Sequence, residues 1–265
     1  MKREKKEVSP SDSNKASSRV PTGIQGFDKL VEGGFPKNTS ILICGGPGTG
    51  KTIFALSYLI NGATDFNEKG LYVTFEQKAD ALREQGKQFG WNIADLEKKG
   101  NLSVMDIPVD KISREVIDSI KTLVKKHGIK RLVVDSLSTL VINAPIYTTP
   151  SELSVKDVVG GNIVFSPPII GDYIAKRFIY TFIDELRDLD CTTLLISEAS
   201  NGGEYITRDT LSEFVCDGVV LITFESMGGA YSRSLIVRKM RATKNDEDVH
   251  PVEINKAGMV VHTLE

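Results

Sequence analysis

The chain has 265 residues, of which 40% are hydrophobic and 26% charged, and its formal net charge is -2. A chain of this length can bury most of the surface that its unfolded form exposes, so it needs no disulfide or metal to fold. The near-neutral charge excludes a general attraction of the chain to nucleic acid or lipid. The three cysteines of the chain lack the paired spacing of a zinc site. No apolar run reaches the length of a membrane span, so we expect a cytoplasmic protein that does not enter membranes.

The amino-terminal segment differs in composition from the rest of the chain. Residues 1–17 are rich in lysine and serine and hold almost no large apolar side chain, which predicts a disordered basic tail. A solvated terminus is the ordinary interpretation of such a segment, and a nucleic-acid-binding tail is the alternative. Residues 18–265 show no internal repeat and no further change of composition, which predicts one domain.

Apolar runs alternate with amphipathic stretches through most of this domain. The runs, rich in β-branched residues, predict strands buried on both faces at 40–46, 71–76, 131–136 and 192–198. The amphipathic stretches predict helices at 52–63, 78–89, 114–126 and 173–189. Four apolar or alternating segments after Phe214 predict carboxy-terminal antiparallel strands. We therefore expect an α/β fold, a mostly parallel twisted sheet flanked by helices.

One segment interrupts this pattern. Residues 143–171 contain several prolines and glycines and lie where a short connection between a strand and a helix is usual. We predict an inserted loop there, which is either functional or a structural flap.

The strongest motif is a phosphate-binding loop between the first predicted strand and helix. It matches G-x-x-x-x-G-K-[ST] without a mismatch, through Gly45, Gly46, Pro47, Gly48, Thr49, Gly50, Lys51 and Thr52. Backbone N–H groups of such a loop and the positive end of the following helix bind phosphate oxygens. Lys51 is expected to reach the β- and γ-phosphates, and the Thr52 hydroxyl to hold Mg²⁺. The sequence thus predicts a site for ATP, or a similar nucleoside triphosphate, with magnesium.

Acidic residues end three of the predicted strands. Asp135 closes the strand RLVVD and is expected to hold Mg²⁺ through water. Glu76 ends LYVTFE and is expected to polarise the water that attacks the γ-phosphate. Glu198 ends TTLLISE, where it either senses the γ-phosphate for the polar loop 199–209 or is a solvated acid.

A spaced basic pair lies near the carboxy terminus. Lys239 and Arg241 share one face of the predicted strand LIVRKMR because side chains alternate along a strand. From the residues alone, an ordinary exposed strand face is the favoured interpretation of this pair.

Several ordered segments resemble a known family. RVPTGIQGFDKLVEGGFPKNTSILICGGPGTGKT is similar to the opening of a KaiC-type domain of the RecA superfamily. GLYVTFEQKADALREQGKQFGWNIADLEKKGNL and LSEFVCDGVVLI with KMRATK resemble its later blocks. The resemblance covers nearly everything from Arg19 on, except 143–171. It implies a RecA-like core, a ring-shaped homo-oligomer (commonly a hexamer) and ATP bound between subunits.

The same resemblance assigns a role to the basic pair. In the family, the matching K-x-R residues reach the γ-phosphate of a neighbouring subunit, so Lys239 and Arg241 are expected to complete its site. Two departures modify the expected activity. Glu76 is followed by Gln77 rather than by a second glutamate, which predicts slow turnover. Glu213 and Phe214 replace the Ser/Thr acceptor pair of the clock protein, which argues against autophosphorylation there.

We therefore predict an ATP-hydrolysing RecA/KaiC-like protein. Its architecture also resembles archaeal RadA paralogs, which implies a role in DNA recombination or repair with single-stranded DNA or a recombinase as partner. The alternative is a slow ATPase that acts as a nucleotide-dependent switch or scaffold and recruits a protein through loops 143–171 and 199–209. No residue that would read the nucleotide base is identifiable from the sequence.

Overall fold

The computed structural model describes residues 19–147, 167–200, 204–227 and 230–263. The predicted tail, residues 1–17, therefore lies outside the described residues. Within the described part, no helix is long and apolar enough to span a bilayer. Cys44, Cys191 and Cys216 are buried free thiols, as their spacing suggested.

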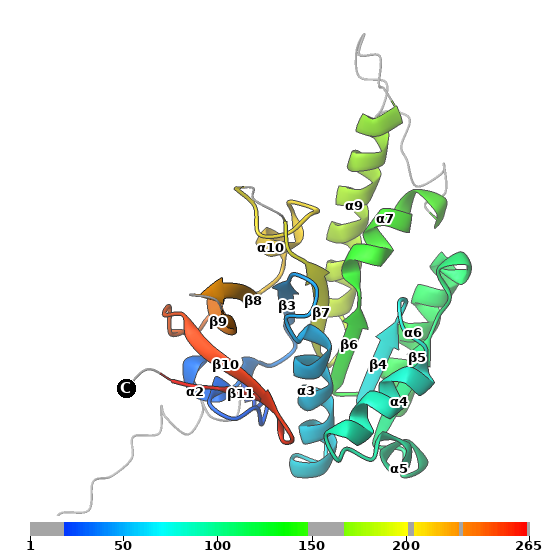
Figure 1. The fold of residues 1–265 in the computed structure, drawn as a ribbon. Helices are drawn as coiled ribbons and strands as arrows, with labels where there is room; N and C mark the ends of the chain where they lie inside the picture. Colours follow the sequence, from blue (N-terminus) through cyan, green and yellow to red (C-terminus); the bar gives the residue numbers. More distant parts are fainter. Residues whose placement is uncertain (1–18, 148–166, 201–203, 228–229, 264–265) are drawn as a thin grey trace, which may run out of the picture.

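A nine-stranded sheet forms the centre of the described chain, in the order β11-β10-β9-β8-β3-β7-β6-β4-β5 (Figure 1). Its strands are β3 (Ser40–Gly45), β4 (Gly70–Thr74), β5 (Leu102–Asp106), β6 (Arg131–Asp135), β7 (Thr192–Glu198), β8 (Gly218–Met227), β9 (Ala230–Met240), β10 (His250–Asn255) and β11 (Gly258–Val261). A separate two-stranded sheet pairs β1 (Arg19–Val20) with β2 (Phe35–Pro36).

Helices cover both faces of the sheet. They are α2 (Phe27–Leu30), α3 (Lys51–Asp65), α4 (Ala79–Gln88), α5 (Ile93–Lys98), α6 (Arg114–His127), α7 (Leu137–Tyr147), α9 (Pro167–Arg187) and α10 (Ser212–Val215), with a 3-10 turn at Val109–Lys111. Side chains of α2, α3, α4 and α5 join one apolar cluster, and those of α6, α7 and α9 join a second. Successive residues of β3 alternate between the two clusters, with Ile41 and Ile43 in the first and Leu42 and Cys44 in the second. The sheet is therefore buried on both sides, which its apolar strands required.

The predicted α/β fold is confirmed, with several additions. Strand β8 pairs parallel with β3 and antiparallel with β9, so the antiparallel part begins at β9. Strand β5, the small sheet of β1 and β2, and the helices α2, α5, α7 and α10 were not predicted. Strand β5 lies at the edge of the sheet, and Leu102 is the only one of its five residues that is buried. An edge strand with so little apolar burial leaves no clear hydrophobic pattern in the sequence.

The predicted loop at 143–171 is partly wrong. Helix α7 continues to Tyr147 and α9 begins at Pro167, so both ends of that segment are helical. No helix was predicted over the residues of α7, and proline is tolerated in the first turn of α9 because its missing N–H has no partner there. Residues 148–166 lie outside the described part of the chain. The two helices extend together beyond the sheet (Figure 1).

Candidate active site

The phosphate-binding loop and the three predicted carboxylates lie together at the carboxyl ends of the parallel strands. Parallel strands end on the same side, and the register places Gly45 beside Glu198 and Thr74 beside Asp135. Since Glu76 follows β4 by two residues, its side chain starts from that same edge. The structure therefore brings together residues that are far apart in the sequence.

The loop adopts a conformation that only glycine adopts readily at two positions. Gly48 and Gly50 have φ angles of 74° and 103°, in the left-handed region. A Cβ atom at Gly50 would also lie 2.8 Å from the Cδ1 atom of Ile254 on β10. The Lys51 side chain folds back over the loop, and its Nζ donates to the carbonyls of Gly45 at 2.9 Å and Gly46 at 2.8 Å.

Asp135 lies deep in the site, with only 4% of its surface exposed. Its Oδ2 accepts a hydrogen bond of 2.5 Å from the hydroxyl of Tyr72, and the Thr52 hydroxyl lies 3.5 Å from the same oxygen. Burial is the largest influence on this carboxyl and raises its pKa to about 6, although Tyr72 and Lys51 act in the opposite direction. Tyr72, buried on β4, was not identified from the sequence because an apolar strand gives no sign of which side chain meets a carboxylate.

Lys51 lies in the field of all three carboxylates. Burial lowers the pKa of its ammonium group, and Asp135, Glu198 and Glu76 act to raise it. The attraction agrees with the strand register, which places Lys51 and the three acids at the carboxyl ends of neighbouring parallel strands. The site therefore joins one cation from the loop to acids from three different strands.

The pKa of Asp135 predicts a pH-dependent affinity for Mg²⁺. Above pH 6 the carboxylate is ionised, whereas below it a metal ion must displace a proton. The apparent affinity for Mg²⁺ in the presence of nucleotide is therefore expected to fall about tenfold per pH unit below pH 6. Calorimetric titration at pH 7.5, 6 and 5 measures the Mg²⁺ affinity. The same titrations of Asp135→Asn give the part of the pH dependence that comes from protonation of the nucleotide itself. Equal pH dependence in the wild type and Asp135→Asn contradicts the prediction.

The Glu76 side chain is exposed, but its position is fixed by the first turn of α7. Its Oε1 accepts hydrogen bonds from the hydroxyls of Ser136 and Thr139, the latter at 2.8 Å. The backbone N–H groups of Glu76 and Gln77 both donate to the Thr74 hydroxyl, at 3.2 and 3.0 Å, which fixes the turn after β4. Sequence reasoning missed Ser136 and Thr139, although both follow Asp135 closely in the chain.

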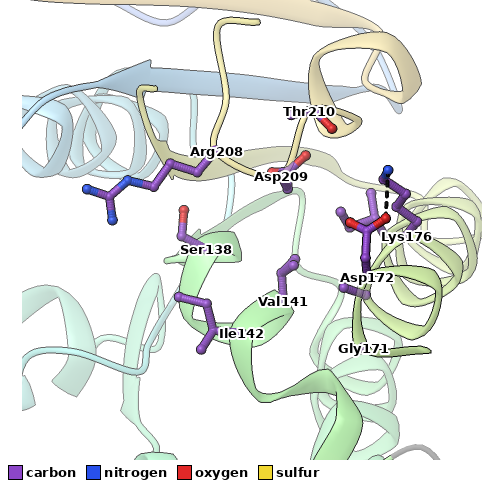
Figure 2. Close-up of a pocket in the computed structure, with 11 residues that line it drawn as sticks. Ser138, Val141, Ile142, Gly171, Asp172, Lys176, Arg208, Asp209 and Thr210 are labelled. Atoms are coloured by element: carbon purple, nitrogen blue, oxygen red, sulfur yellow. Dashed lines mark ion pairs between the residues drawn. The ribbon is translucent and has the colours of Figure 1, made fainter. Parts of the chain in front are cut away.

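Glu198 contacts the next loop rather than solvent alone. Its carboxylate forms an ion pair of 2.5 Å with Arg208, and its backbone N–H donates to the Ser138 hydroxyl at 3.0 Å. Ser138 and Arg208 also line a cavity of about 410 Å³ between α7, α9 and residues 208–210 (Figure 2). The carboxyl end of β7 is thus connected through Glu198 to Arg208, in the loop 199–209 that was expected to respond to the γ-phosphate.

Lys239 and Arg241 lie at the opposite end of the sheet from the phosphate-binding loop of their own chain. Met240, between them, pairs with Gly218, whereas Gly45 pairs with Ile222 four residues further along β8, about 13 Å away at the rise of a strand. The Lys239 ammonium donates to three carbonyls at the end of α10, those of Glu213, Phe214 and Cys216. Arg241 pairs with Asp217 at 2.8 Å. Both side chains therefore lie away from the phosphate-binding loop of their own chain.

A different basic residue of β9 does contact the loop. The Arg233 guanidinium donates to the Gly48 carbonyl at 3.1 Å and lies 4.2 Å from the centre of the Phe224 ring. It also lines a cavity of about 210 Å³ at the start of α3, together with Gly50 and Thr52. Arg233 was not identified from the sequence, because its contact depends on the pairing of β8 with β9.

These residues fit a nucleoside triphosphate with Mg²⁺. A Cβ at Gly46 or Gly48 would meet no atom within 4 Å, so the space beside the loop backbone is open to a phosphate. The first N–H groups of α3 have no acceptor within the helix and face the same space. The Thr52 hydroxyl and the Asp135 carboxylate, 3.5 Å apart, supply the hard oxygen ligands that Mg²⁺ prefers.

A RecA-like sheet with a P-loop at its edge defines a nucleotide-binding protein of the P-loop class. The family model described as "ATPase: KaiC" matches residues 20–148 and 169–265, and the chain belongs to this family as a single KaiC-type domain. The internal unmatched stretch, 149–168, falls inside the segment 143–171 that also stands apart in the sequence.

Relatives and solved structures agree with this assignment. The UPF0273 protein MJ1359 of Methanocaldococcus jannaschii is 32% identical, over 92% of this chain and 96% of its own length. The circadian clock oscillator protein KaiC of Prochlorococcus marinus is 30% identical over 93% of this chain, which spans 46% of that protein. The crystal structure of the KaiC-like protein PH0186 from Pyrococcus horikoshii superposes with a TM-score of 0.72 at 30% identity, covering 92% of this chain and 99% of that one.

Proposed function

We propose that the protein is a magnesium-dependent ATPase that hydrolyses the bond between the β- and γ-phosphates. The observation that supports this most directly is the register of the parallel strands, which brings Glu76, Asp135 and Glu198 to the same strand ends as the P-loop, with Asp135 3.5 Å from the Thr52 hydroxyl. Simple phosphate binding needs only the loop and a cation. Three acids around that cation suit a site that also holds a metal ion and activates water.

Each residue has a distinct role in this proposal. The backbone N–H groups of Gly46 and of Gly48 to Thr52, together with the Lys51 ammonium, hold the phosphates. Thr52 and Asp135 would hold Mg²⁺, which when bound would neutralise charge on the phosphate oxygens. Glu76 accepts a proton from water as the water oxygen attacks the γ-phosphorus. The bond from that phosphorus to the bridging oxygen breaks, and ADP leaves with the electron pair. Glu198 responds to the departure of the γ-phosphate through its ion pair with Arg208.

We further propose that the site is completed by a second copy of the chain in a ring-type homo-oligomer, a hexamer by resemblance. The distance of Lys239 and Arg241 from the loop of their own chain supports this arrangement, because two cations so placed can reach phosphates only across a subunit boundary. An arginine supplied by a neighbour stabilises the charge that develops on the transferred phosphoryl group.

Replacement of Lys51 tests the proposed activity. Lys51→Ala is expected to lower the rate of phosphate release by at least about 100-fold and to weaken nucleotide binding, because it removes the fixed cation from the β- and γ-phosphates. Phosphate release and the binding of a fluorescent ATP analogue measure the two effects. Lys87→Ala is the matched control, since that lysine is exposed and pairs with Glu84 on its own helix. A wild-type rate no higher than that of Lys51→Ala contradicts the proposal.

The process that hydrolysis serves has two candidates. The first is DNA recombination or repair, with single-stranded DNA or a recombinase as partner, as the resemblance to RadA paralogs implies. The second is a nucleotide-dependent switch, favoured by the contact of Glu198 with Arg208 beside the cavity of Figure 2. Single-stranded DNA should accelerate hydrolysis in the first case and leave it unchanged in the second.

A further inference from the structure

The first turn of α7 contacts the proposed general base directly. The Ser136 hydroxyl accepts a hydrogen bond from the Thr139 N–H at 3.2 Å, so its own proton is free to point at Glu76. The Thr139 hydroxyl reaches the same carboxylate oxygen, Oε1, at 2.8 Å. Ser136 is 2% exposed and follows Asp135 directly, so this turn is anchored in the core beside the proposed metal ligand.

Both hydroxyls bind the same oxygen of Glu76. Among the residues that the structure describes, no donor reaches the other oxygen, Oε2. A glutamate on an exposed turn has three rotatable side-chain bonds, and its carboxylate would otherwise occupy many positions. Two donors on Oε1 restrict those rotations and leave Oε2 available to a proton from water.

We propose that Ser136 and Thr139 are positioning residues that fix the carboxylate of Glu76 for proton abstraction. A general base must lie within hydrogen-bond reach of the proton that it removes, and a small misplacement lowers the rate strongly. The inference rests on the proposed function, in which Glu76 is the base. It also gives a physical reason why one glutamate, without a second at Gln77, can serve this site.

The same helical turn contacts the strand that ends in Glu198. The Ser138 hydroxyl lies 3.2 Å from that of Ser197 and accepts from the Glu198 N–H at 3.0 Å. Hydroxyls of residues 136–139 therefore hold the base on one side and the end of β7 on the other. A shift of this turn would move Glu76 and Glu198 together.

Removal of the Thr139 hydroxyl tests the proposal. Thr139→Val keeps the shape of the side chain, and we expect kcat to fall by about 10- to 100-fold while KM and ATP affinity change less than about twofold. Thr139→Ser is expected to restore most of the rate, because it restores the donor. Thr122→Val is the matched control, since that exposed threonine on α6 contacts only a carbonyl of its own helix.

A double variant separates this inference from the proposed function. In a Glu76→Gln background, Thr139→Val is expected to cause no further loss, because Thr139 acts through Glu76. An equal loss in both backgrounds overturns the inference, and so does an unchanged or raised kcat in Thr139→Val. If Glu76→Gln itself retains full activity, the proposed role of Glu76 fails instead.

Discussion

Replacement of Glu76 by glutamine is expected to lower kcat for ATP hydrolysis by about 100- to 10,000-fold, the range that general bases contribute. Glutamine has the same shape, and its amide oxygen can still accept from Ser136 and Thr139, but it cannot take a proton from water. ATP affinity should therefore change little. Phosphate release under saturating ATP and Mg²⁺, with equilibrium binding of ATP in parallel, measures both quantities.

Two neighbouring variants sharpen this experiment. Glu84→Gln removes an exposed glutamate that pairs only with Lys87, and it should leave kcat unchanged. Gln77→Glu restores a pair of adjacent glutamates, and a large increase in kcat would identify position 77 as the limit on turnover. A Glu76→Gln protein that hydrolyses ATP at the wild-type rate would exclude Glu76 as the base.

Replacement of Arg241 by alanine is expected to abolish hydrolysis almost as completely, by about 1,000-fold, because an arginine supplied across an interface contributes that much or more. The loss should appear although Arg241 lies at the far end of the sheet from the P-loop of its own chain. The local ion pair provides the control. Asp217→Asn removes the charge from the 2.8 Å pair with Arg241, and from the 3.5 Å pair with Arg187, and should retain most of the activity.

Mixing two inactive variants tests whether sites are shared. In an equal mixture of Arg241→Ala and Glu76→Gln chains that exchange subunits, about a quarter of the interfaces join an intact Glu76 to an intact Arg241. The mixture should therefore recover about a quarter of the wild-type rate, while each variant alone remains inactive. Failure to recover activity, with exchange shown by light scattering or labelled subunits, contradicts the shared-site model.

Local sequence patterns were sufficient to locate the parts of the candidate site that lie next to strand ends. The P-loop, Asp135 and Glu76 each follow a continuous apolar run, and in a parallel sheet the ends of such runs meet at one edge. The same reasoning failed for β5, because an edge strand with one buried residue has no periodic pattern. It also missed α7 altogether, since the proline and glycine content of residues 143–171 was taken as a sign of a loop.

What the sequence determined by itself is the class of chemistry. The order of residues from Gly45 to Thr52 requires a loop that cradles phosphates, because glycine at Gly48 and Gly50 permits φ angles that other residues avoid. Strands buried on both faces required helices on each side of the sheet.

Only the tertiary structure decided which other side chains serve that chemistry. Tyr72 and Arg233 meet the site through strand register, and Ser136 and Thr139 meet Glu76 because α7 begins beside the turn that follows β4. Lys239 and Arg241 are separated from the P-loop of their own chain by four residues of β8, from Gly218 to Ile222. Such contacts depend on how distant segments pack, and hydrophobic periodicity within one segment carries no information about them.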